Sequence, residues 1–146
     1  MDLIVGIPRS GMLVASIIAL KLNLPLTDLY SFVRNDELTR GNTRNYKHHA
    51  LAKTQDAKKI LLVDDSIASG NSMCEAQAKI REVYLGAVVT MVVFAKKHNI
   101  GESDAYFERF KTPGMFEWDI LHHLFLTLRC LDIDGVLCVD PTAEEN

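Results

Sequence analysis

Two adjacent carboxylates, Asp64 and Asp65, come directly after a short apolar run at residues 60–63. A turn of small and hydroxyl residues follows them, consisting of Ala68, Ser69, Gly70, Asn71 and Ser72. Because Gly70 can adopt a positive φ, such a turn can point several backbone N–H groups at one phosphate monoester. The carboxylates would repel that phosphate and instead suit vicinal hydroxyls or a hydrated Mg²⁺. The stretch therefore predicts a ligand such as a ribose 5-phosphate unit.

The elements around this stretch indicate how it is positioned. Residues 60–63 read as a strand and residues 72–85 as a helix that Gly86 stops, so the turn lies at the carboxyl end of a strand. Ligands bind at that place in open α/β sheets. An ordinary strand–turn–helix with two solvated aspartates is the alternative interpretation.

A second strand–turn–helix opens the chain, with a strand at 3–7 and a helix at 12–22. Its turn contains Gly11 and the cation Arg9, which is a good pyrophosphate ligand at such a position. The alternative is a surface arginine beside a helix start. Strands near 3–7, 29–33, 47–52, 60–63 and 87–94, with helices between them, predict a mainly parallel α/β sheet covered on both faces.

Composition excludes several classes of partner. The chain has 146 residues, enough for one domain with a buried core, and its net charge of −3 gives no bulk reason to bind nucleic acid or an anionic membrane. Three scattered cysteines without metal-binding spacing fit a reducing cytoplasm. The apolar stretch at 12–22 is too short to span a bilayer. We therefore expect a cytoplasmic protein with neither nucleic-acid nor membrane partners.

Residues 63–72 resemble the phosphoribosyl-pyrophosphate (PRPP) motif of the type I phosphoribosyltransferases, which has an apolar strand, two acids and a small–hydroxyl–Gly turn. The resemblance implies that Asp64 and Asp65 hold the ribose 2- and 3-hydroxyls, and that residues 68–72 wrap the 5-phosphate. Residues 6–11 resemble the turn of that family that binds pyrophosphate. They imply a cis peptide between Pro8 and Arg9. The implied pyrophosphate ligands are Pro8, Arg9, Ser10 and Gly11.

The activity implied by this family is transfer of the 5-phosphoribosyl group of PRPP to a nitrogenous base, with Mg²⁺ and release of pyrophosphate. Asp64, Asp65 and Arg9 would be the catalytic residues, and a homodimer is expected. Family members acting on 6-oxopurines often have an acid where this chain has Ala68, which disfavours that class of acceptor. A nucleobase or a similar amine remains the expected partner. The alternative is a non-catalytic PRPP-sensing or regulatory domain fused to a phosphatase-like domain.

The family also has a flexible loop over PRPP and a hood over the base. Residues 34–59 are polar and charged, and the loop candidates are Arg40, Arg44 and Lys47. Phe116 and Trp118 could stack on a base in a small C-terminal hood. Solvated loop charges and simple packing of the two rings are the respective alternatives.

The last residues suggest a second domain. Residues 128–138 resemble motif I of the haloacid-dehalogenase-like phosphatases, with Asp132 and Asp134 in the positions of its two acids. Too few residues follow for that fold, so we expect no phosphatase activity. We divide the chain into a phosphoribosyltransferase-like domain at 1–127 and, at 128–146, an incomplete second domain or linker. A last strand capped by aspartates is the alternative.

Overall fold

The computed structural model describes residues 1–39, 51–95, 103–110 and 116–118. Two compact units divide the chain, Met1–Gly114 and Met115–Asn146. The elements of the first unit are β1 (Leu3–Gly6), α1 (Ser10–Leu22), β2 (Leu26–Asp28), α2 (Leu29–Val33), the 3₁₀ turn η1 (Thr54–Asp56), β3 (Lys59–Ile67), α3 (Asn71–Val83), β4 (Ala87–Ala95) and β5 (Ala105–Arg109). Within the described residues, no helix is both long and apolar enough to cross a membrane.

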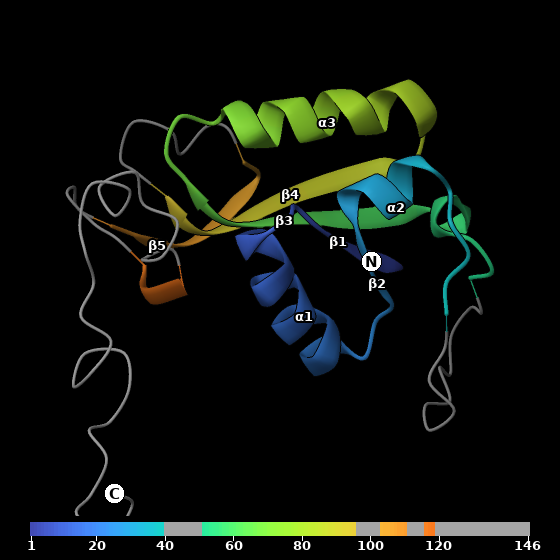
Figure 1. Ribbon diagram of the computed structural model, residues 1–146, viewed down its shortest axis with the longest axis horizontal. Helices are drawn as coiled ribbons and strands as arrows, with labels where there is room; N and C mark the ends of the chain where they lie inside the picture. Colours follow the sequence, from blue (N-terminus) through green and yellow to red (C-terminus); the bar gives the residue numbers. More distant parts are fainter. Residues whose placement is uncertain (40–50, 96–102, 111–115, 119–146) are drawn as a thin grey trace, which may run out of the picture. The chain divides into compact units, whose positions relative to one another are not determined.

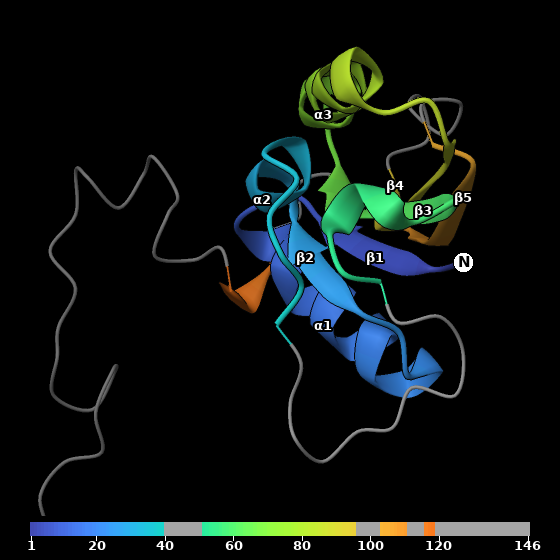
Figure 2. The same ribbon diagram turned by 90° about the vertical axis from the view of Figure 1, so that its right-hand side faces the viewer.

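The five strands form one sheet in the order β2-β1-β3-β4-β5, and every neighbouring pair is parallel. Figures 1 and 2 show α1 on one face of this sheet and α2 and α3 on the other. The chain moves from β1 to β2 in one direction along the sheet and from β3 to β4 in the other. Because both crossovers are right-handed, their helices lie on opposite faces. The expected α/β architecture is confirmed.

The core has two layers because the central strands are apolar on both faces. Val5 and Leu62 are fully buried in the layer beneath α2 and α3. Ile4 and Val63, their neighbours in sequence, are fully buried in the layer beneath α1. The continuous apolar runs at 3–7 and 60–63 therefore reflect burial on both sides, as expected from the sequence.

The strand expected at 29–33 is wrong. The strand is β2, and α2 begins directly after it because Asp28 caps the helix. One oxygen of Asp28, Oδ1, accepts the backbone N–H groups of Tyr30 at 2.8 Å and Ser31 at 3.1 Å. Burial would raise the pKa of Asp28, but its hydrogen bonds with Ser31 and Tyr30 outweigh that effect and lower the pKa.

Helix α3 ends differently from the expectation. Tyr84 already has an extended backbone, with φ −138° and ψ 126°, and Gly86 does not have a positive φ. The Tyr84 ring packs edge-on against Phe32 with centroids 5.2 Å apart, and its hydroxyl donates to the Ala57 carbonyl at 2.8 Å. The helix stops because this side chain enters the core, so the prediction that Gly86 supplies the stop is wrong.

Strand β5 was not expected from the sequence, because most of its residues are exposed. Asp104 fixes its start beside β4. Its Oδ2 accepts the backbone N–H of Thr90 at 2.8 Å and the Thr90 hydroxyl at 2.9 Å, and its own N–H donates to that hydroxyl at 2.9 Å. The bonds from the backbone and the hydroxyl of Thr90 lower the pKa of Asp104.

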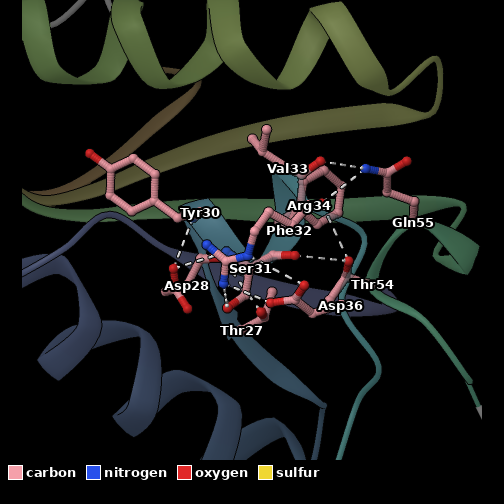
Figure 3. Close-up of polar contacts among 10 residues, drawn as sticks. All are labelled: Thr27, Asp28, Tyr30, Ser31, Phe32, Val33, Arg34, Asp36, Thr54 and Gln55. Carbon is pink, nitrogen blue, oxygen red and sulfur yellow. Dashed lines mark hydrogen bonds and ion pairs between the residues drawn. The ribbon is translucent and has the colours of Figure 1, made fainter.

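A polar network joins α2 to η1 (Figure 3). The hydroxyl of buried Thr54 donates to the Phe32 carbonyl at 3.3 Å, and the Gln55 amide donates to the carbonyls of Phe32 at 2.9 Å and Val33 at 3.2 Å. These bonds satisfy carbonyls at the end of α2.

Three backbone contacts extend this connection toward residue 39. Leu38 N–H donates to the Ala52 carbonyl at 3.0 Å, Thr54 N–H donates to the Asp36 carbonyl at 3.1 Å, and residues 37 and 53 form an antiparallel bridge. The strand expected at 47–52 lies mostly outside the described residues. Its last two residues are described and belong to no strand.

Candidate functional site

The two turns singled out by the sequence meet in one cavity of about 240 Å³. They come together because β1 and β3 are neighbours in the sheet, and Ile7 N–H donates to the Val63 carbonyl at 2.9 Å just beyond the end of β1. Helices α1 and α3 leave these strands on opposite faces, which makes this the topological switch point of the sheet. The lining residues are Ile7, Pro8, Arg9, Ser10, Asp64, Asp65, Ser66, Ile67, Ala68, Ser69, Gly70, Ser72 and Met73.

The turn after β1 has the cis peptide between Pro8 and Arg9 that the family resemblance implies. Pro8 and Arg9 are exposed, Ser10 is half-buried, and α1 begins at Ser10. The Arg9 side chain forms no ion pair or hydrogen bond with another described residue, so its guanidinium is available to an anion in the cavity. A cation beside a helix N-terminus favours a polyanion there.

Gly11 lies behind the cavity and is absent from its lining. A Cβ atom at this position would come within 2.8 Å of the Val63 carbonyl oxygen and 2.9 Å of Asp64 Oδ1. The first turn of α1 therefore lies directly against the first of the two acids. The sequence suggested a pyrophosphate contact for Gly11, and the structure adds a close approach that only glycine permits.

Both acids are buried, with Asp64 8% exposed and Asp65 5% exposed. Strand β3 continues through them to Ile67, so they belong to the sheet and do not follow it. The Asp65 N–H donates to Asp64 Oδ1 at 3.0 Å, and the Ser66 hydroxyl donates to Asp65 Oδ1 at 3.4 Å. The alternative of two solvated aspartates is wrong. Buried carboxylates that line a cavity are placed to bind a polar ligand.

The turn after β3 has the geometry that its glycine predicts. Gly70 has φ 83° and ψ −13°, and it is the only described glycine with a positive φ. The N-cap residue of α3 is Gly70, which has no side chain to cap the helix, so N–H groups of the first turn beyond that of Asn71 remain for an external acceptor. The Ser69 hydroxyl accepts the Asn71 N–H at 3.4 Å, while Asn71 itself is exposed and absent from the cavity lining.

The carboxylates of the cavity are also possible ligands for a metal ion. Asp64 and Asp65 both line the cavity, and within the described part of the chain no three His, Cys, Asp or Glu side chains form a metal-binding group. Two carboxylates are too few for an all-protein cage but suit Mg²⁺, which binds through one or two carboxylates together with substrate phosphates and water. The residues present therefore fit Mg²⁺ held jointly with a phosphorylated ligand.

For several predicted residues the structure leaves the role as a prediction. Phe116 and Trp118 belong to the second unit, where their rings stack on each other with centroids 5.1 Å apart and planes 4° apart. Their role toward a base stays a prediction. The loop candidates and the phosphatase-like acids lie outside the described residues: Arg40, Arg44, Lys47, Asp132 and Asp134.

Among the described residues, four line the cavity that the sequence did not single out as site residues: Ile7, Ser66, Ile67 and Met73. Each is directly adjacent in sequence to a predicted site residue. Their place next to the two turns was the only signal in the sequence.

An all-parallel sheet whose two central strands end in turns around one cavity defines an α/β protein with its ligand site at the switch point. The chain belongs to the phosphoribosyl transferase domain family, whose sequence model matches residues 1–124. It is therefore a phosphoribosyltransferase, an enzyme of the glycosyltransferase class.

Two solved structures illustrate the fold similarity. The purine phosphoribosyltransferase from Pyrococcus horikoshii matches with a TM-score of 0.55 and 18% identity, over 80% of this chain and 76% of that one. The xanthine-guanine-hypoxanthine phosphoribosyltransferase from Helicobacter pylori matches with a TM-score of 0.57 and 19% identity, over 88% and 81%. The comparison with curated protein sequences found no significant match.

Proposed function

We propose that the chain transfers the 5-phosphoribosyl group of PRPP to a nitrogenous base and releases pyrophosphate. The observation that carries this proposal is the single cavity in which the Pro8–Arg9 turn, two buried aspartates and the α3 N-terminus converge. PRPP carries a pyrophosphate, a diol and a monophosphate, and these match the three features in chemistry.

In the reaction, a bond forms between the base nitrogen and C1 of the ribose, the C1–oxygen bond to pyrophosphate breaks, and the proton of the base N–H passes to the released pyrophosphate or to water. Asp64 and Asp65 bind the ribose hydroxyls and stabilise the positive charge that develops on the ring. Arg9 and the N–H groups at the start of α1 stabilise the leaving pyrophosphate, and the turn from Ala68 to Ser72 anchors the 5-phosphate. Bound Mg²⁺ supplies further neutralisation of the phosphate charge. Catalysis consists mainly of positioning and charge stabilisation.

The first test is a thermal melt with PRPP, with and without Mg²⁺. PRPP at 100 times its Kd should add about 2.7 kcal/mol of stability. We expect a Mg²⁺-dependent rise in Tm that Asp64→Asn/Asp65→Asn abolishes. A matched control, Glu75→Gln/Glu82→Gln, removes two exposed carboxylates from α3 and should keep the rise. No rise in the unaltered protein with PRPP would refute the proposed site.

The residue at position 68 bears on which base accepts the phosphoribosyl group. Ala68 is exposed and lines the cavity, but a methyl group cannot take a proton from a base. We propose that the phosphate turn supplies no general base, which disfavours a 6-oxopurine as the acceptor. Pyrophosphate release should be measured with adenine, hypoxanthine, guanine, xanthine, orotate and small amines, for the protein and for Ala68→Asp. Identical activity of both proteins on every acceptor would contradict this argument. PRPP binding without release from any acceptor would favour the regulatory alternative.

We also propose a cytoplasmic homodimer. Leu13, Ile17 and Leu20 form an exposed row along α1. Because the row is uncharged, it can pack against its own copy without like-charge repulsion. Light scattering should give twice the chain mass of 16.4 kDa, and Ile17→Glu should give the monomer. A monomer at all concentrations for the unaltered protein would refute the dimer.

A further inference from the structure

A second cavity, of about 450 Å³, runs along the flank of α3 that faces β4 and β5. Cys74, Gln77 and Arg81 line it from the helix, and Val88 and Thr90 line it from β4. Ser103 and Asp104, just before β5, line it as well. Among the residues that the structure describes, the groove and the first cavity have no lining residue in common.

The sequence of α3 explains this groove. Cys74, Gln77 and Arg81 are three and four residues apart, so they lie along one side of the helix. Met73, Ala76 and Ile80, on a different side, are buried in the core and fix the rotation of α3. In Figure 2, α3 lies over the middle of the sheet, with β5 at the edge. The groove lies between α3 and the β5 edge of the sheet.

Charged and polar groups in the groove have unused bonding capacity. The exposed Arg81 guanidinium forms no ion pair or hydrogen bond with any residue in the described ranges. Asp104 accepts both Thr90 donors on Oδ2, and its Oδ1 receives no hydrogen bond from the same set of residues. The groove therefore offers a cation and a carboxylate oxygen, with an amide at Gln77 and apolar contact at Val88.

We propose that this groove binds a nucleoside 5′-monophosphate. Its phosphate pairs with Arg81, which can bind it through two N–H groups. Asp104 Oδ1 and Gln77 accept hydrogen bonds from ribose hydroxyls or base N–H groups, and the base lies on Val88. The volume is within the usual range for small-molecule sites. The choice of nucleotide rests on the proposed function, because a nucleoside monophosphate is the product of phosphoribosyl transfer to a nucleobase.

The same helix connects the groove to the first cavity. Helix α3 starts at Asn71, inside the turn from Ala68 to Ser72 that we assign to the 5-phosphate of PRPP, and Cys74 lies three residues further along the helix. A nucleotide that holds α3 on its flank acts on a rigid element shared by both sites. We therefore expect its binding to change PRPP affinity, and PRPP binding to change nucleotide affinity by the same factor.

Cys74 provides the assay, since it is an exposed free thiol in the groove. Its alkylation by iodoacetamide is followed by peptide mass spectrometry, with and without adenosine, inosine and uridine 5′-monophosphates. At ten times the Kd of a nucleotide, only about one site in eleven is empty, so alkylation should slow by about tenfold. Arg81→Gln should remove this protection.

Two further variants separate the possible outcomes. Lys79→Gln removes a charge from the same helix where it faces Tyr30, 5.2 Å from the ring centroid, and should keep the protection. Asp65→Asn disables the PRPP site, and this variant should also keep the nucleotide's protection of Cys74. Protection that is lost in Asp65→Asn but kept in Arg81→Gln would assign the nucleotide to the PRPP site and overturn the proposal. Absence of protection by every nucleotide would overturn it too, while the Mg²⁺–PRPP melt reports independently on the proposed function.

Discussion

Replacing Gly11 by alanine tests how tightly α1 is held against the acids of the site. The added Cβ would come within 2.8 Å of the Val63 carbonyl oxygen, 2.9 Å of Asp64 Oδ1 and 3.1 Å of Asp64 Cα. Ordinary contacts begin near 3.4 Å, so neighbouring atoms must shift by about half an ångström. Two of the three atoms belong to the backbone of β3 and cannot rotate away.

The cost can be worked from these contacts. Overpacking of this kind costs about 1–3 kcal/mol, and the better helix propensity of alanine returns at most about 1 kcal/mol. We expect a net loss of about 1–2 kcal/mol, which lowers Tm by about 2–8 °C. The displaced Asp64 carboxylate should in addition lower kcat/KM for PRPP by at least about tenfold, equivalent to about 1.4 kcal/mol.

Gly6→Ala is the matched control. Its Cβ would meet the Met12 sulfur at 2.5 Å and the Ala15 Cβ at 3.0 Å, so it also presses on α1, but its three nearest atoms all belong to α1 and none to Asp64. Thermal melts with and without PRPP and Mg²⁺, together with steady-state kinetics, compare the two variants. If Gly11→Ala reduced kcat/KM no more than Gly6→Ala at equal destabilisation, the positioning argument would be refuted.

Three further predictions concern stability and pH. Gly70→Ala should cost about 1–2 kcal/mol because of the positive φ, and it should weaken the PRPP-induced rise in Tm; an unchanged melt would contradict this. The lowered pKa of Asp104 means that its bonds with Thr90 stabilise the fold above the unfolded value of 3.8 and are lost as pH falls through the folded pKa; urea unfolding from pH 7 to pH 3 should therefore show a difference between the protein and Asp104→Asn that shrinks in acid. Tyr84→Phe should cost about 1–2 kcal/mol in the same assay at pH 7, since the buried Ala57 carbonyl loses its donor.

The sequence predicts best where a single local rule decides the structure. Strands β1, β3 and β4 are apolar on both faces and were expected close to their observed bounds, apart from the extension of β3 through the acids. The positive φ of Gly70 follows from the turn that contains it, whereas the cis peptide between Pro8 and Arg9 was expected only from the resemblance of residues 6–11 to the pyrophosphate turn of the family. The meeting of the two turns follows once β1 and β3 are placed side by side.

The sequence analysis fails where one side-chain contact decides the structure, whether that contact is local, as at Asp28, or distant, as at Asp104. Residues 29–33 are four apolar or aromatic residues and one serine, and in so short a run strand and helix patterns cannot be separated. Asp28 favours the helix α2 because its side chain accepts two backbone N–H groups at the helix start. Strand β5 is recruited by the bond between Asp104 and Thr90, fourteen residues apart, and its own exposed residues carry no strand pattern. The close approach of Gly11 to Asp64 depends on helix–sheet distance, which no spacing in the sequence shows.

The network between α2 and η1 has a consequence for how the chain can vary in length. Leu38 and Ala52 are joined by a backbone hydrogen bond, and the side chains of Thr54 and Gln55 fasten η1 to the end of α2 (Figure 3). The ends of the intervening segment are therefore fixed by bonds that do not involve it. For a segment with fixed ends, each doubling of length costs only about 0.6 kcal/mol in closure entropy. Insertions between residues 39 and 51 should then leave the sheet intact, so this part of the chain is free to diverge or to be replaced by design while the scaffold of the cavity persists.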